Sequence, residues 1–188
     1  LSFGETLWDL LPTGPVLGGA PCNFAYRVNS LGDRAVLVTR LGQDELGRRA
    51  SAQLAQLGLE TAGVQWDDQR PTGIVNVTLD EKSKPDFSIV PEVAYDYLEA
   101  TDEALSWATG ADCFCFGTLI QRSAKAQRAL QQLLEAAGDA LKLLDLNLRK
   151  NCFSEETIAE SLARAEILKL NEEEALYLAE LFHLPAPS

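Results

Sequence analysis

The sequence predicts an α/β protein in which helices cover both faces of a parallel β-sheet. From residue 101 onward, short apolar runs alternate with amphipathic segments of helical length. Such alternation is typical of right-handed βαβ units, which build parallel sheets. The 188 residues, 46% of them hydrophobic, suffice for one domain with a sizeable core. Between residues 72 and 90 the pattern differs and predicts a small β-sheet excursion, or lid, beside the main sheet.

The first part of the chain predicts a strand, a turn and a helix. Residues 1–10 are expected to form a strand that enters a polar segment, and residues 11–15, which contain two prolines, a turn. Pro21 suits the first turn of a helix that Gly32 ends. The apolar stripe of this helix consists of Phe24, Val28 and Leu31.

A short strand at 35–39 precedes a second helix. Asp44 is a good N-cap for this helix, and Gly58 is expected to end it. Its apolar stripe consists of Leu46, Ala50, Leu54 and Leu57.

The excursion consists of two strand-like runs. Residues 72–80 alternate apolar and polar side chains and are rich in β-branched residues, which predicts a half-buried strand. After a polar loop at 81–86, residues 87–90 are expected to return as a second strand.

The second half alternates strands with helices. Thr101 and Ser154 are the expected N-caps of two of these helices. Helices are expected at 101–108, 123–137, 154–164 and 171–182, and strands at 111–116, 140–144 and 165–170. The inward face of the 123–137 helix consists of Ala126, Ala129, Leu130, Leu133, Leu134 and Ala137.

Composition excludes several classes of function. The net charge of −12 would repel phosphate groups at long range, so we expect neither a nucleic-acid nor a membrane-surface partner. No apolar run approaches the roughly 20 residues of a membrane span, and no secretory signal is recognisable. We therefore expect a cytoplasmic protein.

Cysteine and histidine are too scattered for a zinc site or a histidine-dependent nucleophile. The single histidine is His183, and Cys113 and Cys115 are not spaced as a CxxC pair. The four cysteines are expected to be buried, reduced thiols.

Candidate functional residues follow the predicted strands, because ligands of parallel sheets bind beyond the carboxyl ends of the strands. Polar or glycine-rich loops are expected at 5–9, 117–118, 145–149 and 171–174. If the third loop stays extended, Asp145, Asn147 and Arg149 point to one side and could serve a ligand. The alternative is a local ion pair between Asp145 and Arg149, with Asn147 in a turn.

Two other segments also admit two interpretations. Asn171 and Glu174 have the spacing of a helix capping box, and their oxygens would also suit a site for metal and phosphate. Gly18 and Gly19 precede a helix N-terminus whose N–H groups, with Asn23, could bind a ligand, or they could form a tight turn.

Six motifs occur in order along the chain and carry a resemblance. They are GETLWDLLP (4–12), GGAPCNFAYRVNSLGDRAVLVTRLG (18–42), GQDELGRR (42–49), FGTLIQRS (116–123), DLNLR (145–149) and LKLNEEE (168–174). Together they resemble the ribokinase/PfkB family of carbohydrate kinases, most closely its bacterial fructokinase-like branch. The resemblance implies a Rossmann-like (ribokinase-like) core with a β-sheet lid, and ATP-dependent phosphorylation of a sugar hydroxyl with Mg²⁺, here fructose to fructose 6-phosphate.

The resemblance also implies roles for individual residues. The sugar contacts would be Asp9, Gly18, Gly19, Asn23 and Asn147. Arg149 would lie where sugar and transferring phosphate meet and would offset charge there. Asn171 and Glu174 would organise phosphate and Mg²⁺, Glu174 through water. The lid strands would close over the sugar and exclude water.

The chain is shorter than members of this family. Their catalytic base is an aspartate in a Gly-Ala-Gly-Asp loop of the second half, and the similar run at 136–140 is expected to be a helix end closed by Gly138. Residues 1–188 are therefore expected to be an incomplete kinase domain, without its C-terminal half, inactive alone and prone to homodimer formation or other self-association through an apolar sheet edge.

Other functions stay open at this stage. The substrate could be 2-keto-3-deoxygluconate, another sugar or a nucleoside, and the chain could instead be a non-catalytic sugar-binding or interaction module. Tyr95 and Tyr97, near the lid, could stack on a sugar or simply pack in the core.

Overall fold

Six parallel strands form the central sheet of the protein. The computed structural model describes residues 1–79 and 85–185. The strand order is β10-β9-β8-β1-β4-β5, and every pair of neighbours is parallel. These strands are β1 (Ser2–Phe3), β4 (Leu37–Gly42), β5 (Val64–Asp67), β8 (Cys113–Gly117), β9 (Leu141–Asp145) and β10 (Ile167–Lys169). The predicted α/β class is confirmed, although β5 was not predicted.

The helices begin where the sequence places their caps. Asp44, Thr101 and Ser154 each accept a hydrogen bond from a backbone N–H of the first helical turn. The α-helices are α1 (Ala20–Ser30), α2 (Glu45–Gln56), α3 (Asp102–Thr109), α4 (Ala124–Ala136), α5 (Glu155–Arg164) and α6 (Glu172–Leu181). Three 3₁₀ helices that were not predicted are η1 (Thr61–Gly63), η2 (Ala94–Tyr97) and η3 (Leu119–Arg122).

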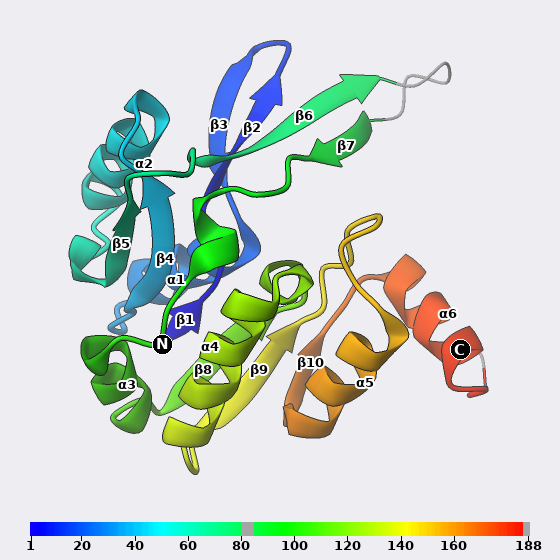
Figure 1. The fold of residues 1–188 in the computed structure, drawn as a ribbon. Coiled ribbons are helices and arrows are strands. Elements are labelled where there is room, and N and C mark those ends of the chain that lie inside the picture. Colours follow the sequence, from blue (N-terminus) through cyan, green and yellow to red (C-terminus); the bar gives the residue numbers. More distant parts are fainter. Residues whose placement is uncertain (80–84, 186–188) are drawn as a thin grey trace.

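Helices pack on both faces of the central sheet (Figure 1). On one face, the predicted inward residues of α4 are all buried against a core that includes Phe3, Phe114 and Leu144. On the other, Cys22 and Ala25 of α1 surround Leu37 together with α2. The predicted stripe of α1 is therefore wrong at its end. Leu31 is 83% exposed, because it lies just past the last residue of α1, and the buried side chains of this helix are instead those of Pro21, Cys22 and Ala25.

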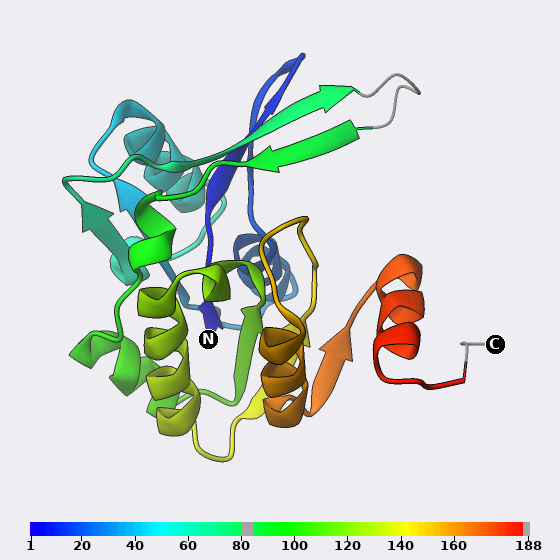
Figure 2. The same ribbon diagram turned by 45° about the vertical axis from the view of Figure 1, so that its right-hand side comes forward.

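A second sheet of four strands, the lid sheet, has the order β3-β2-β6-β7. It consists of β2 (Leu7–Leu11), β3 (Gly14–Gly18), β6 (Gly73–Leu79) and β7 (Pro85–Ile89). Strand β2 runs parallel to β6, whereas the two outer pairs are antiparallel. In Figures 1 and 2 this sheet extends above the loop that follows β9. The predicted two-stranded excursion is therefore only half of the sheet; residue 80, the end of its first predicted strand, and residues 81–84 of its predicted loop lie outside the described residues.

The N-terminal segment contributes the other half of the lid sheet. The predicted single strand over residues 1–10 is divided, because Gly4 has φ +149° and redirects the chain from the central sheet into the lid sheet. The predicted turn at 11–15 is shorter than expected, since β3 already begins at Gly14. Pro15 fits within β3 because β3 is an edge strand, where a missing N–H costs no ladder hydrogen bond.

The cysteines are free thiols, and Cys22, Cys115 and Cys152 are buried, as predicted, whereas Cys113, which was also expected to be buried, is half-buried. Among the helices in the described part of the chain, none has the length and apolar character to cross a bilayer.

Candidate functional site

A cavity of about 370 Å³ lies between the carboxyl end of the central sheet and the lid sheet. Val75 and Ile89 of the lid sheet line one side, and the N-terminal turn of α1 lines another. Its polar and charged lining residues are Glu5, Asp9, Asn23, Arg27, Asp145, Asn147, Arg149 and Lys169. The volume lies within the range of small-molecule sites.

Five of the predicted sugar-site residues line this one cavity: Asp9, Gly19, Asn23, Asn147 and Arg149. They come from β2, from the start of α1 and from the loop after β9. Gly18 stands beside them, since a Cβ atom at that position would lie 2.7 Å from Oδ2 of Asp9. The absence of a side chain at Gly18 thus leaves room for the Asp9 carboxylate.

Asp9 and Arg149 interact electrostatically across the cavity. Burial raises the pKa of the half-buried Asp9 carboxyl, and the positive charge of Arg149 partly offsets this. The cavity therefore combines a hydrogen-bond acceptor with a nearby cation.

One interpretation of residues 145–149 required the loop after β9 to be extended. The structure shows that it is not extended. Asn147 has a positive φ of 41°, so the chain turns there. Asp145, Asn147 and Arg149 nevertheless all line the cavity. The Asp145 carboxylate is paired with Lys169, whose Nζ lies 2.8 Å from both of its oxygens.

The capping box at α6 is confirmed. The Glu174 N–H donates to Oδ1 of Asn171, and the Asn171 N–H donates to Oε2 of Glu174, both at 2.9 Å. Oε1 of Glu174 also accepts from the N–H of Leu148 at 2.8 Å, so this buried carboxylate fixes the loop that carries Arg149. Neither capping residue lines the cavity.

Glu5 is a site residue that sequence reasoning did not select. It lies between β1 and β2, is only 2% exposed and lines the cavity. Its Oε1 accepts a hydrogen bond from the N–H of Ala20 at 3.1 Å, whereas Oε2 is buried without a hydrogen-bond partner. Burial raises the pKa of Glu5 to about 7. Its place in the loop after β1 is shared with neighbouring polar residues, so the sequence alone does not single it out.

Comparison with known proteins agrees with this geometry. The family model described as pfkB family carbohydrate kinase matches residues 14–184. The chain belongs to the pfkB family of carbohydrate kinases. It is 33% identical over 168 residues to a putative sugar kinase of Pyrococcus horikoshii, with 86% of this chain and 54% of that protein covered. A probable fructokinase of Arabidopsis thaliana is 32% identical over 198 residues, with 95% and 61% covered.

Solved structures of a sugar kinase and a fructokinase superpose closely. The crystal structure of the uncharacterized Pyrococcus horikoshii sugar kinase has a TM-score of 0.87 at 29% identity, over 97% of this chain and 66% of that one. A fructokinase from Xylella fastidiosa with bound ATP has a TM-score of 0.85 at 26% identity, over 98% and 61%. The chain thus spans little more than half the length of the curated relatives it matches.

The residues predicted to organise Mg²⁺ do not by themselves form a metal site. Both oxygens of Glu174 already accept backbone N–H groups. Within residues 1–79 and 85–185, no group of three or more His, Cys, Asp or Glu side chains is arranged to hold a metal ion. The water-mediated role of Glu174 stays a prediction.

In this pfkB chain the entry to β6 is hydrogen-bonded to the central sheet. We define the lid root as Thr72, which precedes β6, and residues 90–97, which follow β7. The Thr72 hydroxyl and N–H both donate to Asp44, at 2.8 and 2.7 Å, and the hydroxyl oxygen accepts from the N–H of Gly42. The start of β6 is therefore fixed to the end of β4.

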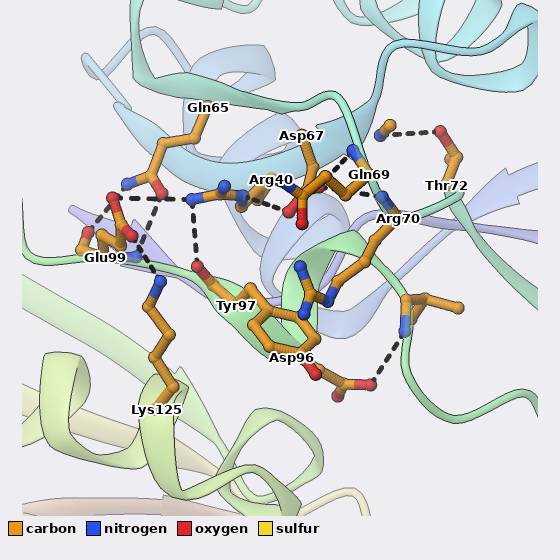
Figure 3. Close-up of polar contacts among 12 residues, drawn as sticks. Arg40, Gln65, Asp67, Gln69, Arg70, Thr72, Asp96, Tyr97, Glu99 and Lys125 are labelled. Atoms are coloured by element: carbon orange, nitrogen blue, oxygen red, sulfur yellow. Dashed lines mark hydrogen bonds and ion pairs between the residues drawn. The ribbon is translucent and has the colours of Figure 1, made fainter.

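A second group of contacts fixes the other part of the lid root, and Figure 3 shows those made by Arg40. Arg40 donates to Asp67 at 2.9 Å and to the carbonyl oxygen of Tyr97 at 3.1 Å. Deeper in the core, Arg122 pairs with Asp96 at 2.8 Å and donates to the carbonyl oxygen of Val90 at 2.9 Å. Both ends of the β6–β7 hairpin are thus attached to the central sheet or to its helices.

The two tyrosines near the lid have structural positions. Tyr95 is fully buried, and its hydroxyl oxygen accepts from Arg122. Tyr97 packs beneath the guanidinium of Arg70, 3.3 Å from the ring centroid. Neither ring lines the cavity, so the packing interpretation is confirmed. The run 136–140 likewise closes α4, with Gly138 at φ +50°.

Proposed function

We propose that residues 1–188 form the sugar-binding part of an ATP-dependent carbohydrate kinase, and that the sugar is fructose, phosphorylated to fructose 6-phosphate. The observation that carries the proposal is the convergence of Asp9, Asn23, Asn147 and Arg149 on one cavity of about 370 Å³. The choice of fructose rests on relatives named as fructokinases.

Each residue has a proposed role. The Asp9 carboxylate accepts hydrogen bonds from two sugar hydroxyls, and Asn23 and Asn147 supply further donors and acceptors. Gly18 and Gly19 keep the approach to the helix N-terminus open. Arg149 stabilises negative charge where the transferred phosphoryl group meets the sugar.

ATP and Mg²⁺ are the proposed co-substrate and metal. When bound, Mg²⁺ would neutralise phosphate charge, and Asn171 and Glu174 would lie near it through water. The lid sheet would exclude water from the cavity, which limits ATP hydrolysis without a sugar.

Residues 1–188 are proposed to be an incomplete kinase domain. The chain spans 54% and 61% of two curated relatives, and the family's Gly-Ala-Gly-Asp loop has no counterpart at a suitable place in the described fold. This chain alone should bind the sugar and transfer no phosphate. ATP-dependent phosphorylation of fructose by these residues alone would contradict this proposal.

Isothermal titration calorimetry with a panel of sugars tests the proposed function. Fructose should bind wild-type protein, and Asp9→Asn should weaken its affinity about 10- to 100-fold, as expected for loss of hydrogen bonds to a charged acceptor. Asp139→Asn, in an exposed turn, is the matched control and should bind like wild type. If the protein binds 2-keto-3-deoxygluconate or a nucleoside more tightly than fructose, that compound is the substrate instead. If it binds none of these compounds, the proposed sugar site is refuted.

Self-association and cytoplasmic location complete the proposal. Edge strand β10 exposes Ile167 (40%) and Leu168 (38%), and neighbouring α6 exposes Leu176 (50%). These side chains favour a homodimer or larger species. Light scattering should show this, and a monodisperse monomer would contradict it. The free thiols fit the reducing cytoplasm.

A further inference from the structure

We propose that Glu5 is an additional sugar-contacting residue, whose Oε2 forms a hydrogen bond with one hydroxyl group of the bound sugar. The inference rests on the proposed sugar site and adds to it a residue outside the family-implied set of contacts. Three features of the structure carry it: how Glu5 is held, which of its atoms lacks a partner, and where the residue lies.

The Glu5 side chain is held by the start of α1. Gly19, the N-cap residue of α1, has no side chain to accept a hydrogen bond from the helix, and Oε1 of Glu5 accepts from the N–H of Ala20 instead. The backbone is also close-packed here, because a Cβ atom at Gly19 would lie 2.3 Å from the carbonyl oxygen of Glu5. The carboxyl group is therefore positioned before any ligand binds.

The second oxygen of this carboxyl group lacks a partner within the described chain. Oε2 is buried and accepts no hydrogen bond from residues 1–79 or 85–185. Leaving a buried polar atom unpaired is unfavourable, so structures rarely keep one without a reason. Glu5 lines the cavity, and we infer that a ligand bound there supplies the missing partner.

A sugar hydroxyl is a chemically suitable partner in either protonation state of Glu5. A hydroxyl group both donates and accepts, so it can pair with a carboxylate or with a protonated carboxyl group. Charged groups of both signs interact electrostatically with Glu5. Arg149 is positive, and Asp145, which is itself paired with Lys169, is negative. Buried Cys22 and Tyr95 lie close enough to interact with it as well. These mixed charges favour neither a cationic nor an anionic ligand group beside Glu5. They favour a neutral polar group.

The contact can be tested by calorimetry with fructose and its monodeoxy analogues, on wild-type protein and Glu5→Met. In wild-type protein, the analogue that lacks the contacted hydroxyl should bind about 10-fold more weakly than fructose. In Glu5→Met, fructose and that analogue should bind equally. Glu5→Gln, which keeps polar atoms at both positions, should restore a difference between the two sugars.

The outcomes separate this inference from the proposed function. If Glu5 only supports α1, Glu5→Met weakens fructose and every analogue by the same factor, and the inference is overturned. If wild-type protein binds none of the sugars, the proposed function fails and the inference fails with it. If Glu5→Met does not fold, a crystal structure of wild-type protein with fructose decides: a sugar oxygen within about 3.2 Å of Oε2 supports the contact, and its absence overturns it.

Discussion

Two regions of this molecule contain buried or half-buried carboxylates whose surroundings differ. Near the lid root, Asp44, Asp67 and Asp96 are hydrogen-bonded by backbone, hydroxyl or guanidinium groups of the chain. In the cavity, Glu5 has one oxygen paired with a backbone N–H and the other unpaired. The difference teaches that the carboxylates near the lid root are satisfied by the fold itself, whereas the fold leaves one oxygen of Glu5 without a partner.

The pKa values follow the same division. Burial alone would raise the pKa of Asp44 and Asp67, but backbone hydrogen bonds outweigh it, with Arg40 assisting at Asp67, and both pKa values lie below their ordinary range. At Glu5 burial dominates over the hydrogen bond from Ala20 and the charge of Arg149, and its pKa is raised to about 7. The same group type thus favours opposite protonation states in the two regions.

Removing a partner at the lid root should have the largest effect. Arg122→Ala leaves Asp96, which is 3% exposed, as a buried carboxylate without its cation. We expect a loss of about 3–5 kcal/mol in the free energy of unfolding, measured by urea denaturation. Arg128→Ala, on the exposed side of α4, is the control and should change stability little. A loss equal to the control's would show that this ion pair does not hold the lid root.

The second largest effect should be seen in the pH dependence of the free energy of unfolding, because the carboxyl groups of the two regions have opposite pKa shifts. In the unfolded chain Glu5 releases its proton near its ordinary pKa of about 4.5, and in the folded protein it keeps the proton up to about 7. Between these values the folded state binds more protons, so the contribution of Glu5 to stability falls as pH rises, by roughly 3 kcal/mol in total.

Glu5→Gln removes this titration. Relative to wild-type protein, the variant should gain roughly 3 kcal/mol of stability between pH 4.5 and pH 7.5, because the wild type weakens and Gln does not titrate. Denaturation curves at both pH values measure this difference. Equal stability differences at the two pH values would show that Glu5 titrates normally.

A single hydroxyl group at the lid root should have a smaller effect. Thr72→Val removes the donor to Asp44 and the acceptor for the N–H of Gly42, which is buried. We expect a loss of about 1–2 kcal/mol in thermal or urea unfolding. Thr13→Val, at an exposed turn, should be nearly neutral by comparison. Indistinguishable stabilities would mean that water replaces Thr72 without cost.

Sequence reasoning predicted most of the central sheet because its signals are local. Asp44, Thr101 and Ser154 cap helices through their own neighbours in the chain, and the apolar stripe of α4 follows helical spacing. The lid sheet was half missed because the pairing of β2 with β6 joins residues far apart in sequence. A turn and an edge strand also share the same glycine and proline signals near Gly14.

The sequence motifs selected Asp9, in β2, and Arg149, after β9, and the structure brings both to one cavity; their roles stay predictions. Prediction of the site missed Glu5, because that residue is distinguished by an unpaired atom rather than by its type or spacing. It also missed that Glu174 fixes the loop carrying Arg149, since the bond to Leu148 depends on how α6 packs after β10. Features of this kind follow from tertiary packing and leave no local pattern in the sequence.

The smallest expected effect concerns the cavity itself and leaves the fold intact. Gly18 has no positive φ, so alanine fits its backbone, but the added Cβ atom would lie 2.7 Å from Oδ2 of Asp9, the free end of a side chain. Asp9 must then rotate away, and we expect fructose affinity to fall about 10-fold with little change in melting temperature. Gly110→Ala, whose Cβ atom would have only an ordinary contact at 3.7 Å, is the matched control. Unchanged fructose affinity in Gly18→Ala would show that the position of the Asp9 carboxylate does not control binding.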